Sequence, residues 1–221
     1  VATGLSSLYS NTTGSNNIAT GLQTLFSTTT GSNNVGVGHQ ALYTNSTADG
    51  NTAIGYQASY SQSTAAYNTA VGWKSLFDCT TGSNNVGVGE SSGANITTGR
   101  YNVAIGNTSL FTNTTSDHNT ALGYAALYTN TGEKNTGVGS NALISNTTAD
   151  HNTAIGYSAL GVNTTGHSNT AVGTLALDAN TTAIRNVAVG HGALGANTTG
   201  TQNDTVGTYA LDANTTGNSN V

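Results

Sequence analysis

Short apolar segments recur along the chain at a fixed interval, and each is followed by glycine. The segment Asn-Thr-Ala-Ile-Gly at 51–55 returns at 152–156, and Asn-Val-Ala-Ile-Gly at 102–106 is closely related to both. The first Asn of this segment recurs every 17 residues, except that the repeat at 119–134 has 16. We number the positions of a repeat from this Asn as columns 1 to 17. A short fixed period predicts an architecture in which each repeat packs on its neighbours.

Two columns carry most of the aliphatic side chains. Column 4 is aliphatic in most repeats, as at Val37 and Ile54, and column 9 is mostly Leu, as at Leu25 and Leu42. A repeat of this length cannot hold two helices with their turns, and the recurring glycine disfavours a helix. We therefore expect two short strands per repeat, at columns 2–6 and 8–10, with columns 4 and 9 filling the interior. Turns are expected at column 7 and at the Asn-Thr-Thr-Gly segment.

These patterns predict an all-β fold, a parallel β-solenoid (β-roll) of about thirteen 17-residue coils. Residues 1–221 are expected to form a single repeat array without a capping domain, because Val1 and Val221 both fall in column 2. Identical side chains on successive coils then form ladders of Asn amides in column 1, while column 5 glycines allow backbones to approach closely. The ladder positions singled out are Asn51, Asn68, Asn102, Asn152, Gly55, Gly72, Gly106, Gly123 and Gly156.

Self-association is expected from column 3 and from the ends of the array. Column 3 holds almost only Ala or Gly, as at Ala53 and Gly87, and a flat strip of small side chains can approach another chain closely. The alternative is that these residues fill a tight turn inside one coil. Uncapped ends favour stacking into a fibre. The expected partner is therefore the chain itself, in a lateral homo-oligomer, an end-to-end stack or both.

The composition excludes several classes of protein. Only 6% of the residues are charged, with 4 Lys plus Arg, 9 Asp plus Glu and no Pro. Disordered tracts normally bring Pro and a high net charge, so the regularly spaced Val, Ile and Leu favour order. So few cations offer no surface for a nucleic-acid backbone. No apolar run is long enough for a membrane span, so no membrane insertion is expected.

Catalytic or metal-binding chemistry is not indicated by the titratable residues. Asp117-His118 and Asp150-His151 occupy the same turn two repeats apart. That separation is about 10 Å along the stack, too far for both pairs to share one ion directly. Cys79 is the only cysteine and is expected to be a quiet thiol at a turn. We therefore expect a protein that is not an enzyme and binds no cofactor or metal.

Aromatic residues follow two columns. Column 10 carries Tyr or Phe in most repeats up to Tyr128, and then changes to Gly161 and Asp178. Rings one rung apart stabilise a solenoid, so stacking between coils is expected for this column. Column 6 supplies rings that could stack on sugars. These candidate glycan-binding residues are Tyr56, Trp73, Tyr124 and Tyr157.

Column 12 creates acceptor motifs for N-linked glycans, because its Asn is followed by Thr or Ser two positions later. The alternative is that this Asn only shapes a turn and a ladder, since modification requires exposed turns and a glycosylating host. The candidate acceptors are Asn11, Asn45, Asn113, Asn146, Asn163, Asn180, Asn197 and Asn214.

The segments at 51–56, 102–106 and 152–157 resemble the Asn-Ser-Val-Ala-Ile-Gly motif in the heads of trimeric autotransporter adhesins. The longer pattern that continues through Asn-Thr-Thr-Gly is also similar to repeats in phage and giant-virus tail-fibre-like proteins. The resemblance covers every repeat. It implies a trimeric parallel β-roll at a cell surface or virion surface, and therefore an extracellular location.

The expected function is that of a structural, non-catalytic shaft in an extracellular fibre, surface adhesin or viral tail fibre. Stacked coils would hold a distal binding element away from a surface or build a filament. One alternative is ice binding by a flat array of Thr pairs such as Thr164-Thr165, Thr181-Thr182 and Thr198-Thr199. Another is adhesion to surface glycans through the rings of column 6.

Overall fold

The computed structural model describes residues 1–221 and contains thirteen short strands and no helix. The chain divides into two compact units, Val1–Asp117 and His118–Val221. In each unit the strands lie parallel and pair in the order of the sequence. Each unit is therefore a parallel β-solenoid, which confirms the predicted fold class.

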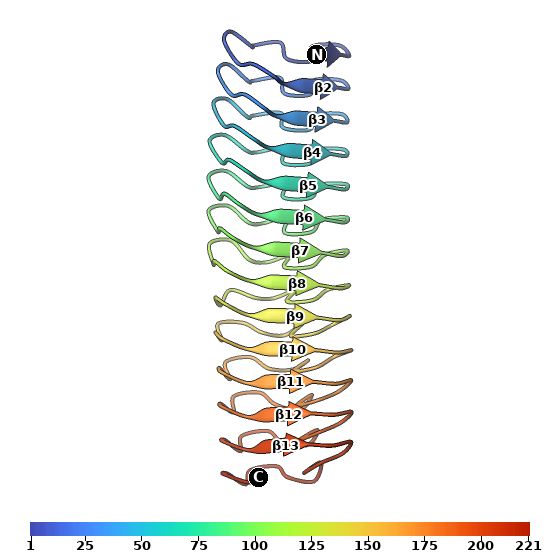
Figure 1. Cartoon of the computed structure of the whole chain (residues 1–221), viewed down its shortest axis with the longest axis vertical. Helices are drawn as coiled ribbons and strands as arrows, with labels where there is room; N and C mark the ends of the chain where they lie inside the picture. The colour runs from blue at the N-terminus through green and yellow to red at the C-terminus, as the bar shows by residue number, and fades with distance from the viewer. The chain divides into compact units, whose positions relative to one another are not determined.

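The N-terminal unit pairs its strands with a constant offset of one repeat. Thr52 of one strand lies opposite Thr69 of the next, and Ile54 lies opposite Val71. Identical columns are thus stacked directly on one another, from blue to green in Figure 1. The strands are β1 (Ala2–Thr3), β2 (Ile18–Thr20), β3 (Val35–Val37), β4 (Thr52–Ile54), β5 (Thr69–Val71), β6 (Val86–Val88) and β7 (Val103–Ile105).

The C-terminal unit keeps the same register even across its short repeat. Thr120 lies opposite Thr136, an offset of 16 residues, because the missing residue belongs to a turn rather than to the strand. Later strands return to the usual offset, with Thr153 opposite Thr170. The strands are β8 (Thr120–Leu122), β9 (Thr136–Val138), β10 (Thr153–Ile155), β11 (Thr170–Val172), β12 (Val187–Val189) and β13 (Asp204–Val206).

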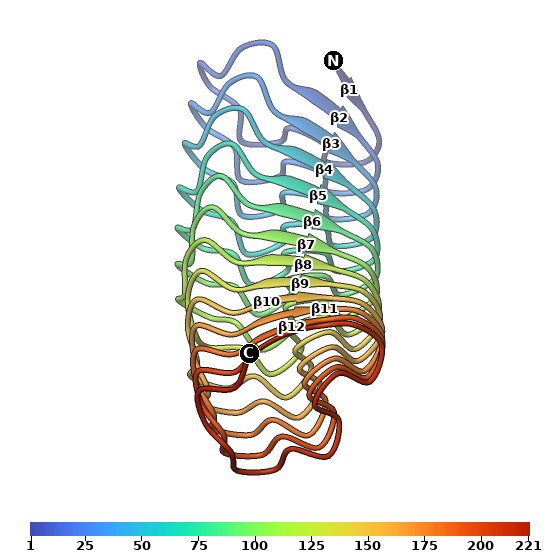
Figure 2. The same cartoon turned by 60° about the horizontal axis from the view of Figure 1, so that its bottom comes forward.

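Each coil contains one strand, at columns 2–4, so the expectation of two strands per coil is wrong. Columns 7 and 9 have left-handed backbone conformations, with φ of 55° at Gln23 and 53° at Leu25, which interrupts an extended chain. Backbone bonds still link this side to the next coil, since the N–H of Leu25 donates to the carbonyl of Ala41 at 3.0 Å. Figure 2 shows the resulting coil outline in each unit, with the strand on one side and turns on the others.

The interior lies between the strand and the Leu of column 9. Leu76 and Leu127 are fully buried, and so are Ala70 and Ala121 of column 3. Where column 3 is Gly87, an added Cβ would lie 2.5 Å from Oγ of Ser75 and 2.8 Å from Cγ of Leu76, so even a methyl group would require these side chains to move. Column 3 is therefore the buried centre of each strand and part of a thin core, and it is neither an external strip between copies nor part of a tight turn.

Column 4 faces outward, contrary to the expectation that it fills the interior. Successive residues of a strand point to opposite faces, so burial of column 3 places columns 2 and 4 outside. Ile54 is 41% exposed and Leu122 is 44% exposed, while Ala53 between the outward positions is fully buried. The aliphatic side chains of column 4 therefore form an outer surface.

Candidate functional surfaces

The Asn ladder of column 1 links successive coils inside each unit. The backbone N–H of Asn68 donates to Oδ1 of Asn51 at 2.9 Å, and Nδ2 of Asn68 donates to the carbonyl of Gly82 at 2.8 Å. The amides of Asn102 and Asn152 bond in the same way, and all four side chains are buried. These amides satisfy backbone groups at the turn before each strand, so they stabilise the coil and are not available to a ligand.

The column 5 glycines lie directly against the backbone of the following coil. Their φ values are near +130°, a conformation that other residues rarely adopt, with 136° at Gly55, 133° at Gly72 and 136° at Gly156. A Cβ at Gly72 would lie 2.5 Å from the carbonyl oxygen of Gly89. The same conformation occurs at Gly106 and Gly123. Both the backbone angle and the space therefore require glycine in this column.

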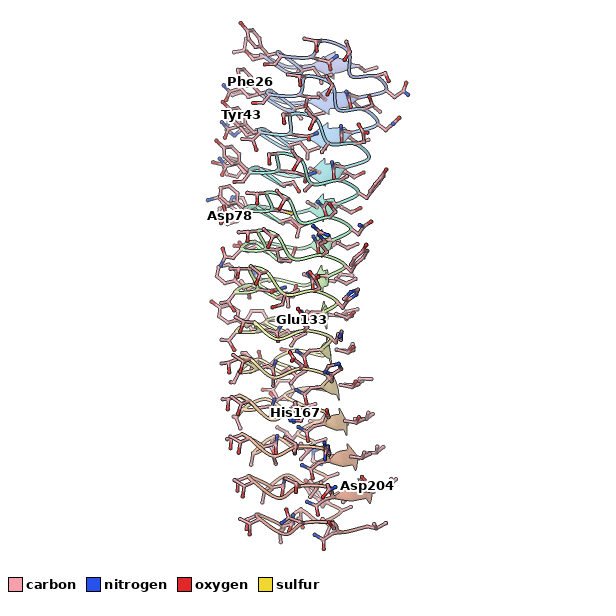
Figure 3. The ribbon with its side chains drawn as sticks, turned by 90° about the vertical axis from the view of Figure 1, so that its left-hand side faces the viewer. Phe26, Tyr43, Asp78, Glu133, His167 and Asp204 are labelled. Carbon is pink, nitrogen blue, oxygen red and sulfur yellow. The ribbon has the colours of Figure 1, made fainter.

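The outer face of the strands is formed by columns 2 and 4. We call it the strand face. Column 2 is Thr or Val and column 4 is Val, Ile or Leu in β3 to β12, and Asp204 on β13 is the only charged residue in either column. Figure 3 labels Asp204 at this strand. Each unit therefore presents a regular surface of β-branched and aliphatic side chains almost free of charge.

Charged side chains gather instead at the corner before each strand, in columns 16 and 17. Oδ1 of Asp49 accepts a hydrogen bond from the backbone N–H of Ser32 at 2.6 Å, and Asp150 accepts one from Glu133 at 2.6 Å. Glu133 and His167, labelled in Figure 3, lie at this corner of the C-terminal unit. No group of three or more His, Cys, Asp and Glu side chains occurs in the structure. The acidic residues thus cap turns of the preceding coil.

The column 10 rings of the N-terminal unit stack on one another. Successive ring centroids are 5.2 Å apart between Phe26 and Tyr43, 5.1 Å between Tyr43 and Tyr60, and 5.3 Å between Tyr60 and Phe77. Figure 3 shows Phe26 and Tyr43 one above the other at the edge of this unit. The rings are nearly parallel and half-buried, so this column packs coil against coil as expected from its spacing.

The rings of column 6 do not form one continuous platform for sugars. Tyr56 stacks between His39 and Trp73, with ring centroids 5.3 Å and 6.2 Å away. Nζ of Lys74 lies 4.7 Å from the ring centroid of Trp73. Sugar stacking requires an open ring face, and the ring of Tyr56 has another ring on either side. Glycan contact at Tyr56 and Trp73 stays a prediction.

Tyr124 and Tyr157 are placed differently from the rings of the N-terminal unit. Their side chains are 59% and 53% exposed. They lie two coils apart in the C-terminal unit, with Ser140 in the same column between them. They stay individual candidates for contact with glycans and do not form a row.

Most of the candidate glycosylation sites are buried, which agrees with the alternative that this Asn shapes a turn and a ladder. Nδ2 of Asn163, the atom that would carry a glycan, donates to Oδ1 of Asn146 at 2.9 Å and to the carbonyl of Gly166 at 2.9 Å. A glycan on this nitrogen would require space inside the coil. Asn11 is exposed and Asn214 is half-buried. The fully buried acceptors are Asn45, Asn113, Asn146, Asn163, Asn180 and Asn197.

The Thr pairs do not form a flat array, so the surface expected for ice binding is not at columns 13 and 14. Oγ1 of Thr164 donates to the carbonyl of Thr181 at 3.0 Å, and Oγ1 of Thr198 donates to the carbonyl of Thr215 at 3.1 Å. These half-buried hydroxyls therefore join coils. In these three pairs the second Thr, such as Thr165 and Thr182, is the exposed one, and it lies in a turn.

Cys79 replaces the column 12 Asn in one coil of the N-terminal unit. The thiol is buried and donates to the carbonyl of Gly82 at 3.2 Å. Burial raises the pKa of this thiol to about 12, while the hydrogen bond to Gly82 opposes that rise. A thiol that stays protonated and covered is a poor nucleophile.

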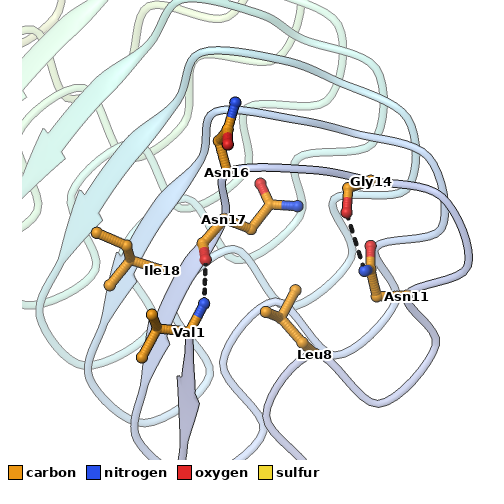
Figure 4. Close-up of a pocket in the computed structure, with 7 residues that line it drawn as sticks. All are labelled: Val1, Leu8, Asn11, Gly14, Asn16, Asn17 and Ile18. Atoms are coloured by element: carbon orange, nitrogen blue, oxygen red, sulfur yellow. Dashed lines mark hydrogen bonds between the residues drawn. The ribbon is translucent and has the colours of Figure 1, made fainter.

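A hollow of about 480 Å³ opens at the first coil, shown in Figure 4. The N-terminal ammonium of Val1 donates to the carbonyl of Asn17 at 2.7 Å, and Nδ2 of Asn11 donates to the carbonyl of Gly14 at 3.0 Å. Leu8 of column 9 lies between these groups. The hollow therefore lies at the open side of the first coil.

Comparison with protein-family models, curated proteins and solved structures gives no match for this chain. The structure contains no helix with the length and apolar character needed to cross a bilayer. The strand face of each unit is a regular surface of exposed and half-buried side chains.

Proposed function

We propose that the chain is a structural, non-catalytic shaft segment that associates with copies of itself through the strand face. The observation that carries this proposal is the outward position of column 4, at residues such as Ile54, Val71, Ile155 and Val172. Regular rows of exposed aliphatic side chains are typical of surfaces that bind another protein. An extracellular fibre, a surface adhesin or a viral tail fibre would use such a segment.

A second copy is the occupant that suits this face best. The backbone N–H and C=O groups of the strands are already paired within the sheet, so a partner would contact side chains alone. Two copies have the same rung spacing, so their rows of columns 2 and 4 would interdigitate along the whole face. Burying a face without charge also avoids the large cost of removing ions from water. A trimer is the proposed assembly, on the resemblance to trimeric adhesin heads.

The proposed assembly is tested by measuring its mass with and without charge on the strand face. Wild-type protein should run as an oligomer in light scattering coupled to size exclusion, at concentrations in the micromolar range. Replacing Ile54→Glu together with Ile155→Glu should give a monomer with an unchanged circular dichroism spectrum. The matched control is Thr64→Glu with Thr165→Glu, which adds the same charge to the same coils in exposed column 14. A monomeric wild-type protein, or equal dissociation of both variants, would contradict the proposal.

Ice binding stays a second candidate, now on the strand face rather than at the Thr pairs. Thr occupies column 2 at Thr52, Thr69, Thr153 and Thr170, two residues from the outward aliphatic side chain of column 4. Hydroxyl and methyl groups would then alternate on a regular surface in which successive coils are about 4.8 Å apart. Thermal hysteresis by a monomeric protein, abolished by Ile54→Glu with Ile155→Glu, would favour this candidate. Assembly without hysteresis would favour the shaft.

A further inference from the structure

The stacked rings of column 10 include one pair of adjacent tyrosines. The stack in the N-terminal unit reads Tyr9, Phe26, Tyr43, Tyr60 and Phe77, with successive ring centroids 5.1 to 5.3 Å apart. Every other contact in this stack joins a tyrosine to a phenylalanine. Tyr43 and Tyr60 therefore form the one place in the stack where two phenol rings lie against each other.

The two phenol rings are placed alike on successive coils. Their planes differ by only 2°, and their centroids are 5.1 Å apart. The backbone beside them is held together, since the N–H of Thr44 donates to the carbonyl of Tyr60 at 3.2 Å and its Oγ1 donates to the same carbonyl at 2.9 Å. The rings thus stay neighbours while these coils are folded, and rotation about side-chain bonds alone brings their ring carbons together.

Both phenols are accessible, and each has a single phenol neighbour. Tyr43 and Tyr60 are half-buried, and Figure 3 shows Tyr43 at the outer edge of the N-terminal unit. An oxidant in solution therefore reaches these rings. Phe26 and Phe77 on either side of the pair carry no hydroxyl group and do not form phenoxyl radicals. A radical formed on one tyrosine of the pair has the other tyrosine as its stacked partner.

We propose that Tyr43 and Tyr60 are a modification site, at which oxidation joins two successive coils through a dityrosine cross-link. Hydrogen peroxide, acting through a haem peroxidase, takes one electron and one proton from each phenol and is reduced to two water molecules. The two phenoxyl radicals then couple between ring carbons next to the hydroxyls, and the hydrogen of each coupled carbon moves to its phenol oxygen.

The cross-link would close a loop of one repeat between two coils. Such a bond restrains the unfolded chain as a disulfide does, so oxidation would strengthen the N-terminal unit without any change to its ladders. The inference rests on the N-terminal unit alone and does not depend on self-association, because column 10 is not part of the strand face.

Hydrogen peroxide with a haem peroxidase tests the proposal on the wild-type chain. Dityrosine fluorescence should appear, while a denaturing gel should still show single chains. Asp49 is the only acidic residue before Lys74, the first basic residue, so cleavage before Asp49 and after Lys74 separates the two tyrosines. Fragments 1–48 and 49–74 should remain joined, with a mass lower by two hydrogen atoms than their sum. Absence of joined fragments, cross-links confined to one fragment, or cross-linked dimers as the main product would overturn the proposal.

Variants locate the site and carry their own control. Tyr43→Phe and Tyr60→Phe should each abolish the joined fragments and still keep the stack, since phenylalanine already holds this column at Phe26 and Phe77. Tyr9→Phe removes a tyrosine whose stacked neighbour is a phenylalanine, so it should leave the yield unchanged. Phe26→Tyr should add a second cross-link, within fragment 1–48. Joined fragments that persist in Tyr60→Phe, or that are lost equally in Tyr9→Phe, would show that radicals couple without regard to the stack.

Discussion

The carbonyl oxygen of Gly139 occupies the space in which a side chain at Gly123 would begin. A Cβ at Gly123 would lie 2.5 Å from this oxygen and 2.6 Å from the carbonyl carbon of the same residue. Gly123 also has φ of 136°. Two independent constraints, the backbone angle and the contact with the next coil, therefore act on one residue.

Gly123→Val should destabilise the C-terminal unit by about 3 kcal/mol or more, because backbone strain and a clash with the next coil add together. Urea unfolding measures the loss, and hydrogen exchange should localise it to the coils of β8, β9 and β10. Tyr124→Ser is the control on the adjacent residue, and it should change stability by less than about 0.5 kcal/mol as an exposed substitution. Equal tolerance of both changes would mean that the recurring glycine reflects duplication rather than geometry.

Asn152→Ala should also destabilise the C-terminal unit. Oδ1 of Asn152 accepts from the backbone N–H of Asn169 at 2.9 Å, and its Nδ2 donates to the carbonyl of Gly166 at 2.8 Å. Removing the amide leaves the backbone N–H of Asn169 unpaired, at a cost of about 1–3 kcal/mol, while the carbonyl of Gly166 keeps its hydrogen bond from Nδ2 of Asn163. The free energy of unfolding in urea measures this cost. Thr165→Ala in an exposed turn of the same coil is the control, and a matching loss there would count against a specific role of the ladder.

Secreted, folded protein from a glycosylating host should carry no glycan at Asn163. The Nδ2 atom of this residue is buried and bonded to Asn146 and Gly166, so a modified chain could not close the coil. Asn11 is exposed and is the expected site of any modification. Mass spectrometry of glycopeptides tests both statements. A glycan at Asn163 in protein with a native circular dichroism spectrum would show that this turn can open.

Cys79 should be unreactive toward a disulfide reagent while the chain is folded. Burial raises the pKa of the thiol to about 12, so almost no thiolate forms at mildly alkaline pH. The reaction rate should rise by orders of magnitude in concentrated guanidinium chloride, where the thiol regains its ordinary pKa and exposure. Colorimetric titration under both conditions measures the difference. A rapid reaction of the native protein would indicate that the turn around Cys79 opens readily.

The sequence by itself determined the length of the repeat and the parallel all-β class. It also determined which positions keep the same residue in every repeat, namely the Asn of column 1 and the glycine of column 5. A constant spacing allows identical residues such as Asn51 and Asn68 to bond from rung to rung, and a glycine as regular as Gly123 indicates a backbone constraint. Both inferences depend on periodicity alone. The Leu of column 9 was also assigned to the core correctly, because it is the most regular large apolar side chain.

Only the tertiary structure decided which face of the strand is inside. A shift of one residue exchanges the two faces of a strand, and the larger Ile54 was expected inside while Ala53 was expected at a surface between copies or in a tight turn. The thin space beneath the column 9 Leu selects the smaller residue, so Ala53 is buried and Ile54 faces outward. The same packing buries Asn163. These outcomes depend on distances between residues of different coils. The spacing of residues along the sequence does not give those distances.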